Sequence, residues 1–284
     1  MEAYFNVHFF KERTRKIDMQ HLLSYFEVLE GTTVKLDSAE MIIDYKMPRL
    51  GYMARFLITK KSKVPNISRL SPKYLDLNFH LELPLLTPDF PTKKLFEIVK
   101  DIANTFELCI YSEMFDDVLP FKMELLMKAF TLAKEAFINK NPSLMREYNV
   151  LDKQILSNIL RYNDEMLSLQ LYYKDENTYV PNYLVLKDEY GQMHLAFEWK
   201  ILAATVFPPN SEYIFYNNET NIKIVSIKET IVALDKLLLD VPGFISNTKV
   251  TGPKLKKIHK IMKKNKFSKI ENRFHQVAIT TLID

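Results

Sequence analysis

The sequence predicts an α+β protein built from two units of mixed strands and helices, joined by a helical segment. Three observations favour this class. Residues 74–83 alternate between apolar and polar side chains, as in a half-buried strand. Amphipathic helical patterns separate the expected strands in both halves of the chain. A chain of 284 residues with 47% hydrophobic and 26% charged residues is long and balanced enough for two modest globular domains.

The predicted N-terminal α+β unit covers residues 1–115. It opens with a strand at 3–10, after which Asp18 caps a helix that ends before Gly31. Thr92 is expected to cap a second helix. Further strands are expected at 32–36, 40–46, 52–59, 74–83 and 107–112. The order strand, helix, several strands, helix, strand is compatible with a ferredoxin-like sandwich that carries extra strands.

A helical connector is predicted at 116–165, with helices that begin at Pro120 and Pro142. The predicted C-terminal α+β unit covers residues 166–284. Its strands are expected at 167–173, 183–187, 193–206, 213–216 and 276–283. The Ser226-Ile227-Lys228-Glu229 sequence is typical of a capping box. The unit ends in a basic amphipathic helix, expected at 254–266.

Positive charge is concentrated at the C-terminal end of the chain. The whole sequence has 39 Lys and Arg and 35 Asp and Glu residues. The segment 249–284 contains ten of the basic residues and two of the acidic ones, so the remaining 29 basic and 33 acidic residues leave a mildly acidic body. This asymmetry indicates an acidic partner.

The predicted basic helix has an apolar stripe that includes Leu255, Ile258 and Met262, which we expect to pack against the body. Phosphates suit the remaining surface because each neutralised phosphate releases a condensed counterion. The simplest interpretation is a docked helix whose lysines are solvated. Among partners, nucleic acid is favoured over an acidic protein surface and an anionic membrane surface. The predicted partner-binding residues are Lys254, Lys256, Lys257, Lys260, Lys263, Lys264 and Lys266.

The segment 250–258 resembles the second half of a helix-hairpin-helix DNA-binding motif. It reads Val-Thr-Gly-Pro-Lys-Leu-Lys-Lys-Ile. The resemblance implies that a hairpin containing Gly252 presents backbone N–H groups to a phosphate. The segment departs from the motif in two ways. Val250 or Thr251 stands where the motif usually has a second glycine, and residues 242–248 separate the segment from the preceding helix.

Known catalytic signatures are missing from the sequence. There is no Walker motif, GxSxG, HExxH, paired CxxC or dinucleotide fingerprint. Five glycines are few for a fold built on glycine-rich phosphate loops. We therefore expect a binding or regulatory protein without enzymatic activity or cofactor. The alternatives are a metal-dependent enzyme and an assembly subunit that docks through its basic helix; the oligomeric state stays open.

The best candidate for an enzymatic site is the polar face of the strand at 74–83, which carries Asp76, Asn78, His80 and Glu82. Alternate residues of a strand lie about 6–7 Å apart, so His80 and Glu82 could share one metal ion. A third ligand from another element would be required. The plainer interpretation is a solvated strand face.

Cellular location is expected to be cytoplasmic. The single cysteine, Cys109, lies in an apolar run and is expected to be an inert thiol. The first ten residues lack a signal-peptide pattern. No run approaches the ~20 apolar residues that cross a bilayer.

Overall fold

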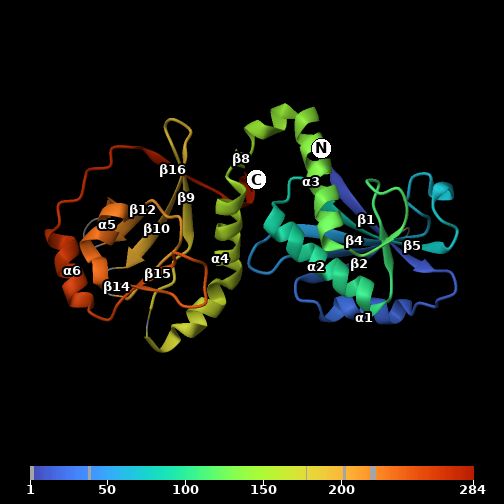
Figure 1. The fold of residues 1–284 in the computed structure, drawn as a ribbon, viewed down its shortest axis with the longest axis horizontal. Coiled ribbons are helices and arrows are strands. Elements are labelled where there is room, and N and C mark those ends of the chain that lie inside the picture. The colour runs from blue at the N-terminus through green and yellow to red at the C-terminus, as the bar shows by residue number, and fades with distance from the viewer. Residues whose placement is uncertain (1–2, 38–39, 177, 201–202, 218–221) are drawn as a thin grey trace. The chain divides into compact units, whose positions relative to one another are not determined.

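A computed structural model describes residues 3–37, 40–176, 178–200, 203–217 and 222–284. The predicted α+β class is confirmed, because helices and β-sheets occur together along these residues (Figure 1). The chain forms two compact units that meet in the sequence at Asn149 and Val150. The segment 116–165 is divided between them. No described helix is both long and apolar enough to cross a membrane.

The first unit combines three helices with one large sheet. Its strands are β1 (Tyr4–Glu12), β2 (Thr32–Leu36), β3 (Glu40–Lys46), β4 (Met53–Thr59), β5 (Tyr74–Pro84), β6 (Cys109–Tyr111) and β7 (Leu119–Pro120). Its helices are α1 (Met19–Val28), α2 (Asp89–Thr105) and α3 (Met123–Lys140). The strands form a seven-stranded sheet in the order β2-β3-β4-β5-β1-β6-β7.

The strand order of this sheet agrees with the expected ferredoxin-like sandwich that carries extra strands. β1 lies between β5 and β6 and is antiparallel to both. The other described pairs of this sheet are antiparallel as well. In a ferredoxin-like sandwich two strand–helix–strand units interleave in an antiparallel sheet, and the order β4-β5-β1-β6, with α1 after β1 and α2 after β5, has this form. β2, β3 and β7 are the additional strands.

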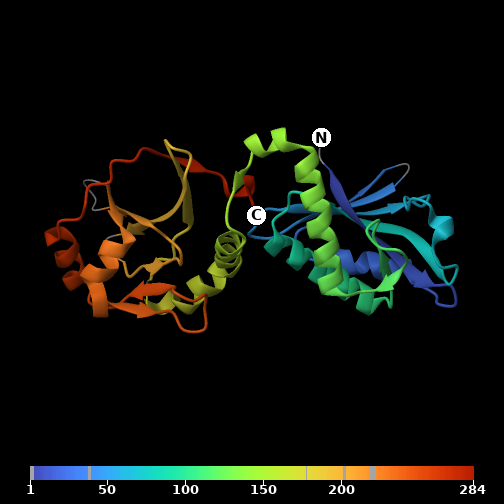
Figure 2. The ribbon, with the colours of Figure 1, turned by 45° about the horizontal axis from the view of Figure 1, so that its top comes forward.

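The helices of the first unit lie on one side of its sheet (Figure 2), and aromatic rings join them to that face. The ring of Phe26 on α1 lies 4.9 Å from that of Phe56. Phe5 on β1 contacts Phe96 of α2 and Phe130 of α3 at 6.2 and 5.5 Å. All five residues are buried. The helices therefore cover the sheet face that contains these rings, and the other face contains His8 and His80.

The second unit contains two further sheets. Its strands are β9 (Tyr183–Asp188), β10 (Met193–Lys200), β11 (Val206–Phe207), β12 (Tyr213–Asn217), β13 (Ile222–Ser226), β14 (Leu238–Asp240), β15 (Lys249–Thr251) and β16 (Phe274–Val277). Its helices are α4 (Lys153–Tyr172), α5 (Ile227–Leu234) and α6 (Leu255–Lys264). The sheet orders are β13-β12-β10-β9-β16 and β11-β15-β14. A further short pair joins β8 (Asn149–Val150) to β17 (Leu282–Ile283).

Trp199 is the centre of the core of the second unit. It is the only tryptophan in the sequence and is 1% exposed. Its ring lies 5.1 Å from those of Phe207 and Tyr216, so both sheets contribute to this core. Residues of α5 and α6 complete the same cluster. The fluorescence of Trp199 therefore reports on the folding of this unit.

The predicted strand at 167–173 is wrong, because these residues are the last turns of α4 and the turn after it. Alternating leucines at 167, 169 and 171 suggested a strand. The helix instead buries Leu169 and leaves Leu171 63% exposed. Its start is fixed by Asp152, whose carboxylate accepts hydrogen bonds from the N–H groups of Gln154 and Ile155.

Several helix and strand ends differ from the expected ones. The cap at Asp18 is confirmed, since its carboxylate accepts from the N–H groups of Gln20 and His21. Thr92 is no cap; it is buried inside α2, which begins at Asp89. The strand expected at 276–283 is interrupted by the 3₁₀ turn Ile279–Thr281. The strand expected at 193–206 ends at Lys200, before positions 201–202, which lie outside the described residues.

The helical course of α4 predicts different costs for two similar substitutions. Leu169→Ala should lower the free energy of unfolding by about 2–5 kcal/mol, because it leaves a cavity in the core. Leu171→Ala should change it by less than about 0.5 kcal/mol, because that side chain is exposed. Urea unfolding followed by Trp199 fluorescence measures both. If both substitutions lowered the free energy of unfolding equally, the helical course of residues 167–172 would be contradicted.

Candidate functional site

The basic helix α6 begins without a side-chain cap. Lys254 occupies the N-cap position, and none of its side-chain atoms caps the first turn. A helix of ten residues is marginal in water by itself. Its stability must therefore come from packing.

That packing comes from one apolar face of α6. Ile258 and Met262 are 2% and 3% exposed, within the cluster around Trp199. Leu255 and Ile261 pack against the edge of the same cluster. The expected docking of the helix on the body is thereby confirmed. Burial on this scale is worth about 1.5–3 kcal/mol for each of the two fully buried side chains.

Two polar contacts tie α6 and the segment after it to the same unit. His259 and Tyr216 are joined by a 3.2 Å hydrogen bond between Nδ1 and Oη. The carboxylate of Glu229 accepts hydrogen bonds from the N–H and hydroxyl of Ser268. These bonds lower the pKa of Glu229. The predicted capping box is therefore wrong: Ser226 makes no side-chain cap, and Glu229 is engaged with Ser268.

The seven predicted partner-binding lysines all lie on the exposed surface of α6 or directly beside it. Within the described parts of the chain, none has a carboxylate within ion-pair distance. Lysines on either side of the helix are paired, Lys249 with Asp240 at 2.7 Å and Lys269 with Glu271 at 3.5 Å. A shallow groove of about 440 Å³ follows the outer side of α6. It is lined by Lys257, Lys260, Ile261, Lys264 and Asn265, and we call this set the lysine stripe.

The lysine stripe is electrostatically unfavourable without an anion. Lys257, Lys260 and Lys264 are separated by three or four positions, where like charges destabilise a helix by about 0.2–0.5 kcal/mol per pair. The positive N-terminal end of the helix dipole adds to the repulsion at Lys256 and Lys257. A bound anion would reverse both effects.

A larger cavity at the N-terminal end of α6 has the opposite character. It measures about 650 Å³ and is lined in part by Tyr172, Tyr173, Glu176, Asp240 and Leu255. Its two carboxylates disfavour a phosphate at this end. Of these two hollows, the lysine stripe is therefore electrostatically the more favourable for an anion.

The structure does not reproduce the helix-hairpin-helix resemblance. Val250 and Thr251 belong to strand β15, so no helix leads into the turn. The N–H of Gly252 donates to the carbonyl of Leu237 at 2.8 Å. This N–H is consequently committed within the protein and is not offered to a phosphate.

His80 and Glu82 lie close together, and His8 supplies a third polar group from β1. His80 Nε2 is 3.7 Å from Glu82 Oε1. The rings of His8 and His80 stack with centroids 5.0 Å apart. Proximity of His80 lowers the pKa of Glu82. His80 is 3% exposed, so the interpretation as a solvated strand face was wrong at this position.

This histidine cluster does not form a metal site. Throughout the described residues, no group of three or more His, Cys, Asp or Glu side chains has an arrangement that could hold a metal ion. Asp76 and Asn78 are displaced from the pair by a break in register: Phe9 opposes Phe79, but Phe10 opposes Asp76. Burial, with a smaller effect of His80, lowers the pKa of His8 to about 3. His8 is consequently a neutral, buried ring.

A second histidine cluster was not foreseen from the sequence. His194 on β10 approaches Glu212 at 2.9 Å through Nδ1 and Asp188 at 3.2 Å through Nε2. Burial alone would lower its pKa, but these two hydrogen bonds raise it above the ordinary value. The two carboxylates thus favour the protonated ring, which bridges β9, β10 and the turn before β12. Only its isolated position in an apolar strand could have drawn attention to it.

Cys109 is partly exposed, and burial raises the pKa of its thiol. A thiol with a raised pKa is a poor nucleophile at neutral pH.

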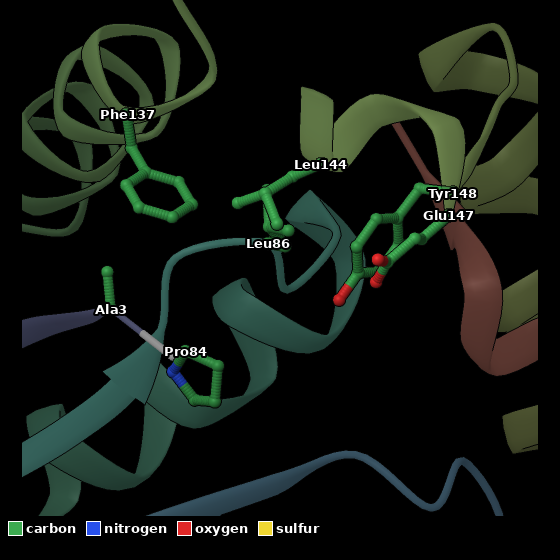
Figure 3. Close-up of a pocket in the computed structure, with 7 residues that line it drawn as sticks. All are labelled: Ala3, Pro84, Leu86, Phe137, Leu144, Glu147 and Tyr148. Carbon is green, nitrogen blue, oxygen red and sulfur yellow. The ribbon is translucent and has the colours of Figure 1, made fainter. Parts of the chain in front are cut away.

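A small hollow in the first unit completes the cavities of interest (Figure 3). It measures about 240 Å³, and the carboxylate of Glu147 and the hydroxyl of Tyr148 face it from one side. The remaining lining is apolar and consists of Ala3, Pro84, Leu86, Phe137 and Leu144. Ligand sites usually measure about 300–1,000 Å³, so we assign no ligand to this hollow.

Comparisons with known proteins identify no relative. No protein-family model, no curated protein and no solved structure matches the chain significantly.

The docking of α6 predicts the cost of removing its central contact. Ile258→Ala should lower the free energy of unfolding by about 2–5 kcal/mol, as for other buried aliphatic side chains. Val232→Ala on α5 is the matched control, since Val232 is 80% exposed and should cost less than about 0.5 kcal/mol. Trp199 fluorescence during urea unfolding measures both. A negligible cost for Ile258→Ala would show that α6 is free.

The neutral state of His8 predicts that the folded protein loses stability in acid. Its folded pKa of about 3 lies below the ordinary 6.5, so the unfolded state binds the proton more readily. The stabilisation is complete above pH 6.5 and is lost as the pH falls from 6.5 towards 3; by pH 5 the loss from this ring is about 2 kcal/mol. His8→Phe should remove this part of the pH dependence. Urea unfolding at pH 7.5 and pH 5, followed by circular dichroism, measures the change in the free energy of unfolding between the two pH values. The same change in His8→Phe as in the parent would contradict a neutral His8.

Proposed function

We propose that this protein is a non-enzymatic binding or regulatory protein that contacts an acidic partner through the lysine stripe of α6. The observation that carries the proposal is a row of exposed lysines on a helix whose opposite face is fixed in the core. Among the residues that the structure describes, no carboxylate pairs with these lysines. A flexible tail would lose conformational entropy on binding. A docked helix presents its charges already arranged.

Nucleic acid is the favoured partner class. Lys257 and Lys264 are seven residues apart, which corresponds to about 10 Å along the helix. One strand of duplex DNA presents about three phosphates over that length. The stripe contains three lysines and no arginine, which suits charge neutralisation more than base recognition. We therefore propose binding with little sequence preference.

Reversing the charge of the stripe tests the proposal. The triple variant Lys257→Glu, Lys260→Glu and Lys264→Glu should elute earlier from heparin and bind a short DNA duplex at least about tenfold more weakly. The slope of log Kd against the logarithm of the salt concentration should also fall by up to about 2.7, because each lost phosphate contact removes about 0.9 from this slope. Fluorescence anisotropy measures both, with duplex and single-stranded DNA compared.

A control of equal charge separates the stripe from net charge. Lys93, Lys100 and Lys128 are exposed on α2 and α3 of the first unit. Their triple change to Glu should leave the affinity and the salt dependence close to those of the parent. If both triple variants weaken binding equally, or neither does, the stripe is not the binding surface. Unchanged DNA binding with loss of an acidic protein ligand would favour the protein alternative.

A further inference from the structure

A cavity of about 370 Å³ lies in the first unit, where the segment 60–72 passes over the ends of β1 and β5. Its size is within the usual range for small-molecule sites, about 300–1,000 Å³. It is separate from the lysine stripe, which belongs to the second unit. Neither the proposed function nor the histidine clusters use it.

Hydrogen bonds hold the wall of this cavity in place. The N–H of Ser71 donates to Asp117 Oδ1 at 3.0 Å, and the N–H of Arg13 donates to the carbonyl of Lys73 at 3.0 Å. At the start of the segment 60–72, the hydroxyl of Thr59 donates to the carbonyl of Lys61 at 2.7 Å. The cavity is therefore preformed.

Hydrogen-bond donors predominate on one side of the cavity. Arg13 Nε donates to the carbonyl of Pro72 at 2.7 Å, and its terminal nitrogens have no carboxylate partner among the described residues. The hydroxyl oxygens of Ser62 and Ser71 accept from backbone N–H groups, so their hydrogens are left to donate. Guanidinium and hydroxyl donors together match a carboxylate.

Asp76 also lines the cavity, and its carboxylate is only partly satisfied. Asp76 Oδ1 accepts from the N–H of Asn78 at 2.9 Å. Its Oδ2 is buried away from the cavity surface, and no described group donates a hydrogen bond to it. One backbone N–H leaves most of the hydrogen-bonding capacity of this carboxylate unused, and an ammonium group in the cavity would complement it through Oδ1. The rest of the wall includes Phe10, Ile67 and Leu70.

We propose that this cavity binds a free α-amino acid with an apolar side chain. The ligand carboxylate would contact Arg13 and the hydroxyls of Ser62 and Ser71. The ammonium group would contact Asp76, and the side chain would lie against Phe10, Ile67 and Leu70. A ligand with only one charge would leave either the guanidinium or the carboxylate without a partner.

L-Phenylalanine and two matched analogues test the two poles separately. 2-Phenylethylamine lacks the carboxylate, and N-acetyl-L-phenylalanine lacks the ammonium group. Isothermal titration of the full-length protein should show L-phenylalanine binding at least about tenfold more tightly than either analogue, a difference of about 1.4 kcal/mol.

Two conservative variants assign each pole to its residue. Arg13→Gln should weaken the binding of L-phenylalanine but not that of 2-phenylethylamine, because the latter has no carboxylate to contact Arg13. Asp76→Asn should weaken the binding of L-phenylalanine but not that of N-acetyl-L-phenylalanine, which has no ammonium group to contact Asp76. Arg69→Gln is the control; Arg69 is exposed on the same segment and does not line the cavity, so binding should be unchanged.

Circular dichroism and thermal unfolding establish that each variant is folded, and Arg13→Lys, which keeps the charge, replaces Arg13→Gln if that variant does not fold. Three outcomes would overturn the proposal. These are no binding of L-phenylalanine by the parent at millimolar concentration, equal binding of the analogues, and an equal loss in the Arg69→Gln control. If only N-acetyl-L-phenylalanine, the analogue that keeps the carboxylate, binds preferentially, the cavity is a simple anion site and not an amino-acid site.

Discussion

The burial of Ile258 and Met262 beside Trp199 is the interaction on which the interpretation of the second unit depends. Without it, the C-terminal segment would be a charged chain too short to hold a helix in water. With it, the lysines occupy fixed positions on the opposite side. The core therefore fixes the positions of the lysines in the stripe, although no lysine of the stripe belongs to that core.

Hydrogen bonds outside the regular elements hold both candidate sites. Glu229 binds the backbone of Ser268 after α6, and Asp117 binds the backbone of Ser71 beside the cavity of the first unit. In each case a carboxylate satisfies a backbone N–H from a distant segment. These contacts connect parts of the chain that no local sequence pattern links.

Buried histidines have opposite roles in the two units. Burial lowers the pKa of His8 to about 3, whereas hydrogen bonds to two carboxylates raise the pKa of His194 above its ordinary value. The same side-chain type therefore responds to acid in opposite directions. Neither histidine lies in a cluster able to hold a metal among the described residues.

The sequence by itself determined the α+β class, the amphipathic basic helix and the cap at Asp18, because periodicity, composition and capping are local properties. It mistook the end of α4 for a strand, since alternating leucines fit either period over a short span. Only the tertiary structure decided that Glu229 binds Ser268, that His8 stacks on His80, and that segment 60–72 encloses a cavity. These outcomes depend on contacts between residues far apart in the chain, and their geometry follows from strand order and register, which local patterns do not encode.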